Sequence, residues 1–142
     1  MIDNKGQISL EYLLIFSISL IILIAFTLPI VEIAIEDTFD ISNSLNTKSE
    51  MMKLSNAITQ VYSEGQGSKQ SVNLNLNSPV TLNIYNSYIS TSITLHDNSK
   101  KSFKVLHNSN LAPSTLSLQK GNNRIVVEWP IKEEYMIISK QF

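Results

Sequence analysis

Two histidines and their neighbours are the residues of this chain whose types could support hydrolysis or metal binding. His96 is followed directly by Asp97 and then by Ser99, and His107 comes later in the chain. Adjacent residues of a strand point to opposite faces of a sheet, so His96 and Asp97 cannot act together in a strand. Because both histidines have turn-like neighbours, we interpret them as solvent-exposed loop residues.

The remaining residues offer no other catalytic arrangement. The sequence has no cysteine, which excludes disulfides, thiolate catalysis and thiolate metal sites. Paired carboxylates, a phosphate-binding loop and a cluster of metal ligands are missing from the sequence as well. The net charge of −1 gives no strong field toward nucleic acid. We therefore predict that the protein is not an enzyme, with no catalytic residue, metal, cofactor or nucleic-acid partner.

One carboxylate does occupy an unusual place. Glu11 directly precedes a run from Tyr12 to Val31 that contains no charged residue. A carboxylate in a membrane helix costs free energy unless it is neutralised or paired, up to about 3 kcal/mol at the bilayer centre. An acid also suits the first turn of a helix because of the helix dipole. That simpler interpretation explains the acid but not the residues around it.

The uncharged run has the length of a membrane-spanning helix. About twenty residues at a rise of 1.5 Å span about 30 Å, which is the thickness of a hydrocarbon core. Burying about 16 large apolar side chains at about 2 kcal/mol each contributes on the order of 30 kcal/mol. The helix must therefore lie in lipid or be wrapped by other protein.

Charges on either side of the run predict its orientation. Lys5 lies on the N-terminal side, and the charged residues between the run and Lys48 are all acidic. This bias favours a membrane-inserted precursor with its N-terminus inside and its C-terminus outside. A conventional secretory signal fits poorly, because the apolar stretch is too long and no small-x-small cleavage site follows it. A plain membrane anchor remains an alternative.

Pro29 lies inside the helical pattern. Proline removes one backbone hydrogen bond and clashes with the carbonyl four residues earlier, so we predict a kink or loosened turn between Ala25 and Pro29. Alternatively, Pro29 ends the membrane segment at the interface. Ser17, Ser19 and Thr27 are small or polar points at which neighbouring helices could approach closely.

Apolar residues recur at steps of three, four and seven from Ile30 to Tyr62, which predicts an amphipathic helix. Residues 38–48 are poor helix formers, so a local break is possible there. Gly65 and Gly67 then predict the end of the helix.

From Ser71 onward the apolar spacing changes to two, which is typical of strands. Turn signals separate seven candidate strands, at residues 72–76, 80–84, 88–95, 103–106, 116–118, 124–129 and 136–139. This pattern predicts a small antiparallel β-sandwich, and the helix would complete its core because about 70 residues alone bury little. The predicted fold class is α+β, with a long N-terminal hydrophobic and amphipathic helix followed by the β-sandwich head.

Residues 5–13 read Lys-Gly-Gln-Ile-Ser-Leu-Glu-Tyr-Leu. This pattern resembles the class III signal peptide of archaeal type IV pilins, in which a short leader ends in Gly and the mature protein begins Gln-x-Ser-x-Glu-Tyr. The resemblance implies that a prepilin peptidase cuts between Gly6 and Gln7. It also implies roles in peptidase recognition or assembly for the surrounding residues, Lys5, Ser9, Glu11 and Tyr12. Archaellins fit less well, since their sequence after the cut is rich in Gly, Ala and Val.

In related pilins the corresponding glutamate is thought to meet the terminal amine of a neighbouring subunit. Cleavage would free such an amine at Gln7, about 6 Å above Glu11 along the helix. Losing one partner of a buried ion pair costs about 3–5 kcal/mol. If Gln7 cyclises to pyroglutamate, the amine loses its charge, and Glu11 must instead be protonated or hydrogen-bonded. The sequence leaves both possibilities open.

The resemblance implies four segments and a lollipop-shaped pilin. Residues 1–6 form the cleaved leader, 7–31 the transmembrane and filament-core helix, 32–64 an amphipathic extension and 65–142 the β-sandwich head. The mature protein would be the structural subunit of an extracellular archaeal type IV pilus-like filament, with a role in adhesion or surface attachment. The implied partners are membrane lipid before assembly, prepilin peptidase, an assembly ATPase, a membrane platform protein and other copies of the chain in a helical filament. Alternatives are a minor pilin or pseudopilin, or a permanently anchored β-sandwich binding module.

Overall fold

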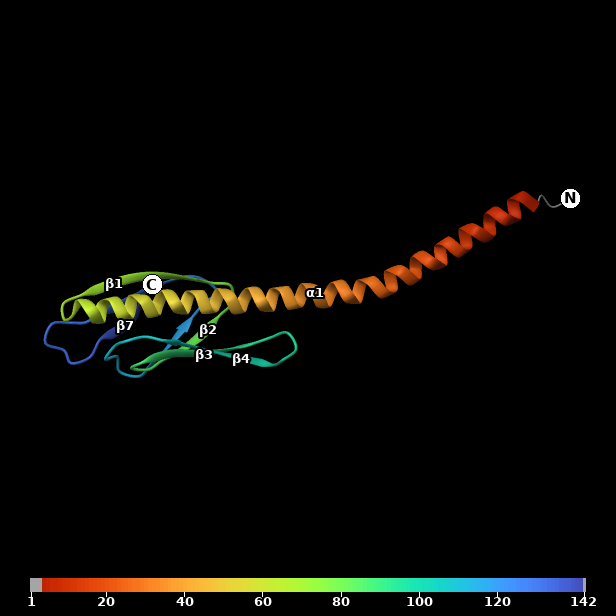
Figure 1. The fold of residues 1–142 in the computed structure, drawn as a ribbon. Helices are drawn as coiled ribbons and strands as arrows, with labels where there is room; N and C mark the ends of the chain where they lie inside the picture. Colours follow the sequence, from red (N-terminus) through yellow and green to blue (C-terminus); the bar gives the residue numbers. More distant parts are fainter. Residues whose placement is uncertain (1–3, 142) are drawn as a thin grey trace. The chain divides into compact units, whose positions relative to one another are not determined.

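The structure is a computed structural model that describes residues 4–141, with side chains described for residues 9–141. One long helix precedes seven strands (Figure 1), which are α1 (Asn4–Glu64), β1 (Lys69–Leu76), β2 (Val80–Ile84), β3 (Tyr88–Thr94), β4 (Lys100–Leu106), β5 (Ser114–Leu118), β6 (Gly121–Glu128) and β7 (Ile137–Gln141). The chain divides into two compact units, the N-terminal unit (Met1–Phe39) and the head unit (Asp40–Phe142). The functional boundaries predicted after residues 6, 31 and 64 stay predictions.

Helix α1 is continuous through residues 38–48, where a break had been possible. Tertiary contacts explain why poor helix formers stay helical there. Asn46 donates from Nδ2 to the carbonyl of Asn75 at 3.0 Å, and it accepts the backbone N–H of Asn77 at 3.0 Å. Ser44 and Thr47 are buried on the same side of the helix. Short polar side chains thus attach this part of α1 to the C-terminal end of β1 and to the turn that follows it.

The end of α1 follows the predicted glycine signal. Gly65 adopts a φ of 87°, a left-handed conformation that costs a glycine little. Its N–H donates to the carbonyl of Val61 at 3.1 Å, and the Ser68 hydroxyl donates to the same carbonyl at 2.9 Å. These bonds satisfy a carbonyl that the helix end would otherwise leave open.

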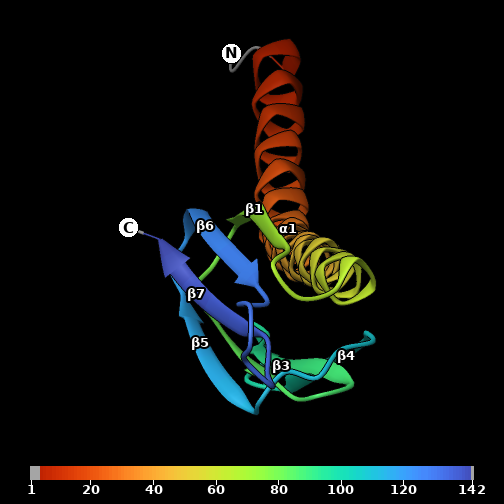
Figure 2. The same cartoon turned by 90° about the vertical axis from the view of Figure 1, so that its left-hand side faces the viewer.

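The seven strands form two antiparallel sheets in the head unit (Figure 2). One sheet has the order β1-β6-β7, and the other has the order β4-β3-β2-β5. Each observed strand overlaps one that the apolar spacing predicted, and the α+β fold class is confirmed. Alternation of buried and exposed residues is strict in β2, where Val80, Leu82 and Ile84 are buried and the residues between them are exposed.

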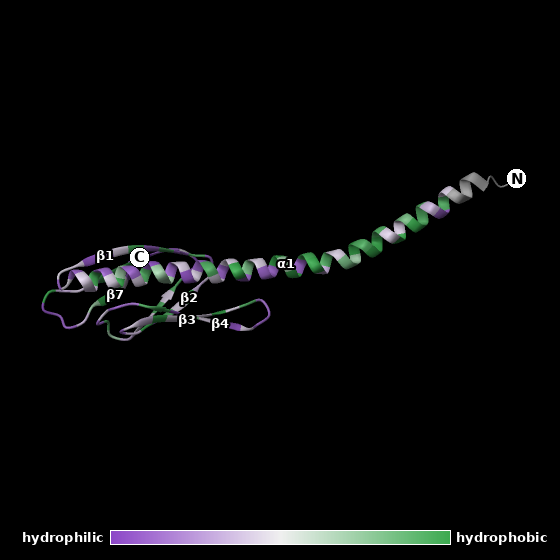
Figure 3. Cartoon of the chain, in the orientation of Figure 1, coloured by the Kyte–Doolittle hydropathy of each residue, from purple (hydrophilic) through white to green (hydrophobic). Residues whose placement is uncertain are grey.

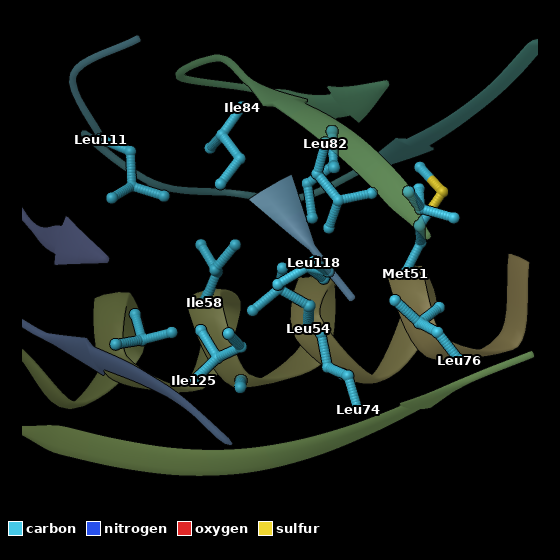
Figure 4. Packing of buried hydrophobic residues seen from close by; sticks show 14 of the residues in the cluster. Met51, Leu54, Ile58, Leu74, Leu76, Leu82, Ile84, Leu111, Leu118 and Ile125 are labelled. Carbon is cyan, nitrogen blue, oxygen red and sulfur yellow. The ribbon is translucent and has the colours of Figure 1, made fainter. Parts of the chain in front are cut away.

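A single core joins α1 to both sheets (Figure 4). Apolar side chains from the helix meet those from β1, β2, β5 and β6, as shown by Met51, Leu54, Ile58, Leu74, Leu76, Leu82, Ile84, Leu118 and Ile125. Each of these residues is at most 3% exposed. The C-terminal part of α1 is therefore an integral part of the head unit, as the small size of the sheets required.

Candidate processing and assembly site

The predicted cleavage bond lies near the beginning of α1. The helix starts at Asn4, so the backbone of Gly6 and Gln7 is helical. Glycine inside a helix costs about 1 kcal/mol relative to alanine, which lowers the free energy needed to open this turn for a protease. The side chains of Lys5 and Gln7 lie outside the described ones. The roles predicted for these residues and for Gly6 stay predictions.

Ser9, Glu11 and Tyr12 are all exposed on the first turns of the helix. Tyr12 is 70% exposed. Among the described side chains, residues 9–141, none forms an ion pair or hydrogen bond with the Glu11 carboxylate. This part of the chain therefore does not neutralise Glu11. In an apolar environment Glu11 must therefore be protonated, or it must meet a compensating group from the extreme N-terminus or from another molecule.

The helix surface from Tyr12 to Val31 is mainly apolar and carries no charge (Figure 3). Large apolar side chains from Leu10 to Ile35 are between 45% and 72% exposed. No residue from 9 to 35 is buried. By length and composition α1 can cross a membrane. A helix that is apolar all round requires lipid or surrounding protein.

Three hydroxyl groups in this surface are hydrogen-bonded within the helix. Ser17 and Ser19 donate to the carbonyls four residues earlier at 2.8 Å each. Thr27 donates to the carbonyl of Leu23 at 2.7 Å. Their protons need no water, so these residues fit a lipid or dry protein environment. They leave small side chains at which another helix can pack closely.

Pro29 lies within the helix and does not end it. About five turns separate it from Glu11, which places both residues on the same helix face. The predicted kink and the alternative placement of Pro29 at the membrane interface both stay predictions. Beyond Pro29, Asp40 contacts the β3–β4 turn, where its Oδ2 accepts the backbone N–H of His96 at 2.9 Å.

The two histidines do not form one site. His96 is exposed, as predicted. Asp97 belongs to the β3–β4 turn, where hydrogen bonds from the Ser99 hydroxyl and backbone amide hold the pKa of the Asp97 carboxyl below its usual value. No group of three or more His, Asp or Glu residues among those described could hold a metal ion.

The prediction that His107 is exposed is wrong, because this residue is only 6% exposed. The backbone N–H of His107 donates to the carbonyl of Ser87 at 3.0 Å. The Ser55 hydroxyl of α1 donates to the carbonyl of the preceding residue, Leu106, at 2.7 Å. These contacts between distant segments draw the end of β4 under the helix. Neither ring nitrogen of His107 has a hydrogen-bond partner of good geometry among the described residues.

Burial lowers the pKa of the His107 imidazole. The backbone carbonyls of Tyr88 and Tyr85 lie near enough to offset part of that effect. His107 is therefore neutral at pH 7. It fills space in the head unit and offers no exposed group for chemistry.

Comparison with known families identifies the N-terminal segment. The family model described as "Class III signal peptide" matches residues 4–30. No curated protein and no solved structure matches the chain. The matched segment contains the Gly6–Gln7 bond, Glu11 and most of the apolar run.

Proposed function

We propose that this type IV pilin-like prepilin is a structural subunit of an archaeal type IV pilus-like surface filament, cleaved between Gly6 and Gln7 and assembled by bundling its α1 helices. The class III signal peptide supports the pilin-like assignment. It implies processing by prepilin peptidase and use of a pilus assembly machinery in general. The observation that carries the rest is the apolar run from Tyr12 to Val31, in which every residue is exposed.

The energetics of that surface support assembly by bundling. Exposing it to water costs on the order of 30 kcal/mol, so a mature subunit leaves the membrane only where other apolar surface receives it. Transfer from lipid to a helix bundle gains little, since both are apolar. External work is therefore needed, which an assembly ATPase acting through a membrane platform protein would supply. Once formed, the filament persists because dissociation would expose the helix.

Glu11 would set the register between copies. Its carboxylate has no partner among residues 9–141. The α-amine freed at Gln7 of a neighbouring copy would supply the opposite charge. If Gln7 is cyclised instead, the Glu11 carboxyl is protonated, and this neutral group donates or accepts a hydrogen bond.

Location and role follow from this arrangement. The precursor is proposed to insert with its N-terminus inside and its head unit outside, so that the mature filament presents the head units to the surroundings. Adhesion is then a property of the head unit. We further propose that the chain acts without catalysis, a view supported by the role of Asp97 in a turn and the burial of His107.

The test is to substitute Glu11 in the full chain, in cells that assemble the filament. Glu11→Ala is expected to keep membrane insertion but to reduce sheared surface filaments more than 100-fold, as loss of about 3–5 kcal/mol per subunit implies. Glu32→Ala is the matched control, because Glu32 is an exposed acid on the same helix beyond the apolar run. Its filament yield should match the unsubstituted chain.

Glu11→Gln separates the two forms of the contact. Retained assembly indicates that Glu11 acts in a neutral, hydrogen-bonded form, whereas loss of assembly indicates an ion pair. Wild-type filament yield in Glu11→Ala would contradict the proposed role of Glu11. A chain that inserts but never appears in sheared filaments would point to a permanently anchored binding module. Trace amounts confined to a filament end would point to a minor pilin or pseudopilin.

A further inference from the structure

Three loops of the head unit border an open pocket of about 610 Å³. They are the β2–β3 turn (residues 85–87), the β4–β5 loop (107–113) and the β6–β7 loop (129–136). The β4–β5 loop lies near the C-terminal part of α1, because the backbone N–H of Asn108 donates to the Thr59 hydroxyl at 3.4 Å. Figure 2 looks onto this end of the head unit. Its volume is in the range of small-molecule sites.

Hydrogen bonds between the loops hold the pocket in shape. The Ser109 hydroxyl donates to the carbonyl of Asn86 at 3.1 Å, which joins the β4–β5 loop to the β2–β3 turn. Asn110 donates from Nδ2 to the carbonyl of Glu134 at 2.5 Å, which joins it to the β6–β7 loop. A pocket that is already formed loses less conformational entropy when a ligand binds.

Two tyrosines provide aromatic surface in this pocket. Tyr85 stacks on Tyr88 with ring centroids 4.5 Å apart, and Lys104 Nζ lies 3.9 Å from the Tyr88 centroid. This packing fixes one side of the Tyr85 ring, yet the residue is still 38% exposed. Tyr135, from the β6–β7 loop, is 50% exposed. The pocket therefore offers open aromatic surface from two different loops.

Polar groups in the pocket are uncharged. None of the described residues that line it is acidic or basic. The side-chain amides of Asn86 and Asn110 each contain both donor and acceptor groups. Asn110 Oδ1 is buried without a hydrogen-bond partner among the described residues, so only a ligand donor that enters this buried space would remove that energetic cost. An ionic ligand would find no opposite charge here.

We propose that this pocket binds a neutral saccharide. Sugar hydroxyls both donate and accept hydrogen bonds, which matches side-chain amides, and the C–H faces of a pyranose ring are apolar, which matches tyrosine rings. Tyrosine, asparagine and serine are also the residues that recognition loops use most, since they combine rigid aromatic area with adaptable hydrogen bonding. The inference rests on the head unit alone and does not depend on filament assembly.

A proline-rich peptide is the other ligand that aromatic grooves accept. It is less well matched, because such a peptide presents mainly carbonyl acceptors and has few donors for the amide oxygens of Asn86 and Asn110. The peptide is therefore an outcome of the test and not the proposed ligand.

The test uses the full chain in a phosphocholine detergent, since detergents with sugar head groups would compete. Cellohexaose, mannohexaose and chitohexaose are titrated by calorimetry, beside a charged oligogalacturonate and a proline-rich decapeptide. At least one neutral hexasaccharide is expected to bind. Tyr135→Ala and Asn86→Ala should each weaken that binding at least tenfold with an unchanged unfolding midpoint. Both side chains are exposed, so neither substitution disturbs the core.

Ile131→Ala is the matched control. Ile131 lies in the same loop as Tyr135 and is 71% exposed, but it does not line the pocket. Its affinity should equal that of the unsubstituted chain. The proposal is overturned if no neutral hexasaccharide binds, if both pocket variants bind as well as the original chain, or if only the oligogalacturonate or the decapeptide binds.

Discussion

Substituting Leu54 by alanine tests whether the C-terminal part of α1 is part of the head's core. Leu54 is 0% exposed, and it packs in the cluster that joins α1 to both sheets. Buried Leu→Ala changes cost about 3–5 kcal/mol, because both apolar transfer energy and packing are lost. With a urea slope of about 1.5 kcal/mol per molar, a loss of about 3 kcal/mol lowers the unfolding midpoint by about 2 M.

The sequence offers a matched control and a built-in probe. Leu45 lies on the same helix but is 64% exposed, so Leu45→Ala should change the free energy of unfolding by less than about 0.5 kcal/mol. Trp129 is the single tryptophan. Its ring stacks on Tyr62 of α1 with centroids 5.7 Å apart, so its fluorescence reports the contact between helix and sheets. Equal midpoints for the two variants would refute the assignment of α1 to the core.

Three further predictions concern the stability of the head unit and each rest on one residue. Lowering the pH from 7.5 to 5 should destabilise the head unit, because burial lowers the folded-state pKa of His107. The unfolded chain takes up the proton as the pH falls through about 6.5, so the free energy of unfolding decreases by no more than about 1.4 kcal/mol per pH unit. In His107→Phe the urea midpoint should depend less on pH over that range. Gly65→Ala should cost about 1–2 kcal/mol in urea unfolding because of its φ of 87°, although an added Cβ would meet nothing within 4 Å. Asn46→Ala should cost about 1 kcal/mol through the lost bonds to Asn75 of β1 and to Asn77 just after it, whereas exposed Asn56→Ala should leave the midpoint unchanged.

Strands could be predicted from the sequence because their side chains alternate over short distances. The apolar spacing located each of the seven, but it placed the start of β4 at Phe103, whereas the strand begins at Lys100. Residues Lys100 to Ser102 have no apolar signal. They are strand residues because they pair with β3, from Ser92 to Thr94, and pairing partners cannot be read from one segment.

The buried face of α1 was harder to predict. Apolar spacing suggested a single stripe from Ile30 to Tyr62, yet Leu45 and Met52 are at least 50% exposed. Polar Glu50 is instead buried, where its carboxylate meets Lys53 Nζ at 2.6 Å and accepts the N–H of Asn75 at 3.2 Å. A buried acid is acceptable only when such partners exist, and the backbone partner comes from a strand far along the chain.

The two candidate sites also differ in whether their residues are close together in the sequence. The processing motif is contiguous, so residues 5–13 could be recognised from their order alone. The pocket in the head unit brings Tyr85, Asn110 and Tyr135 together from three loops. Nothing in the local sequence marks these residues, because their proximity depends on the order of strands in two sheets. His107 was misassigned for the same reason.

The mass of the mature N-terminus tests the central claim most directly. Filaments or membranes are isolated from cells that contain the peptidase, and the N-terminal peptide is identified by mass spectrometry. We predict a chain that begins at Gln7, with or without loss of ammonia, and that retains the apolar run from Tyr12 to Val31. An intact Met1, or a cut after Val31, would contradict the account.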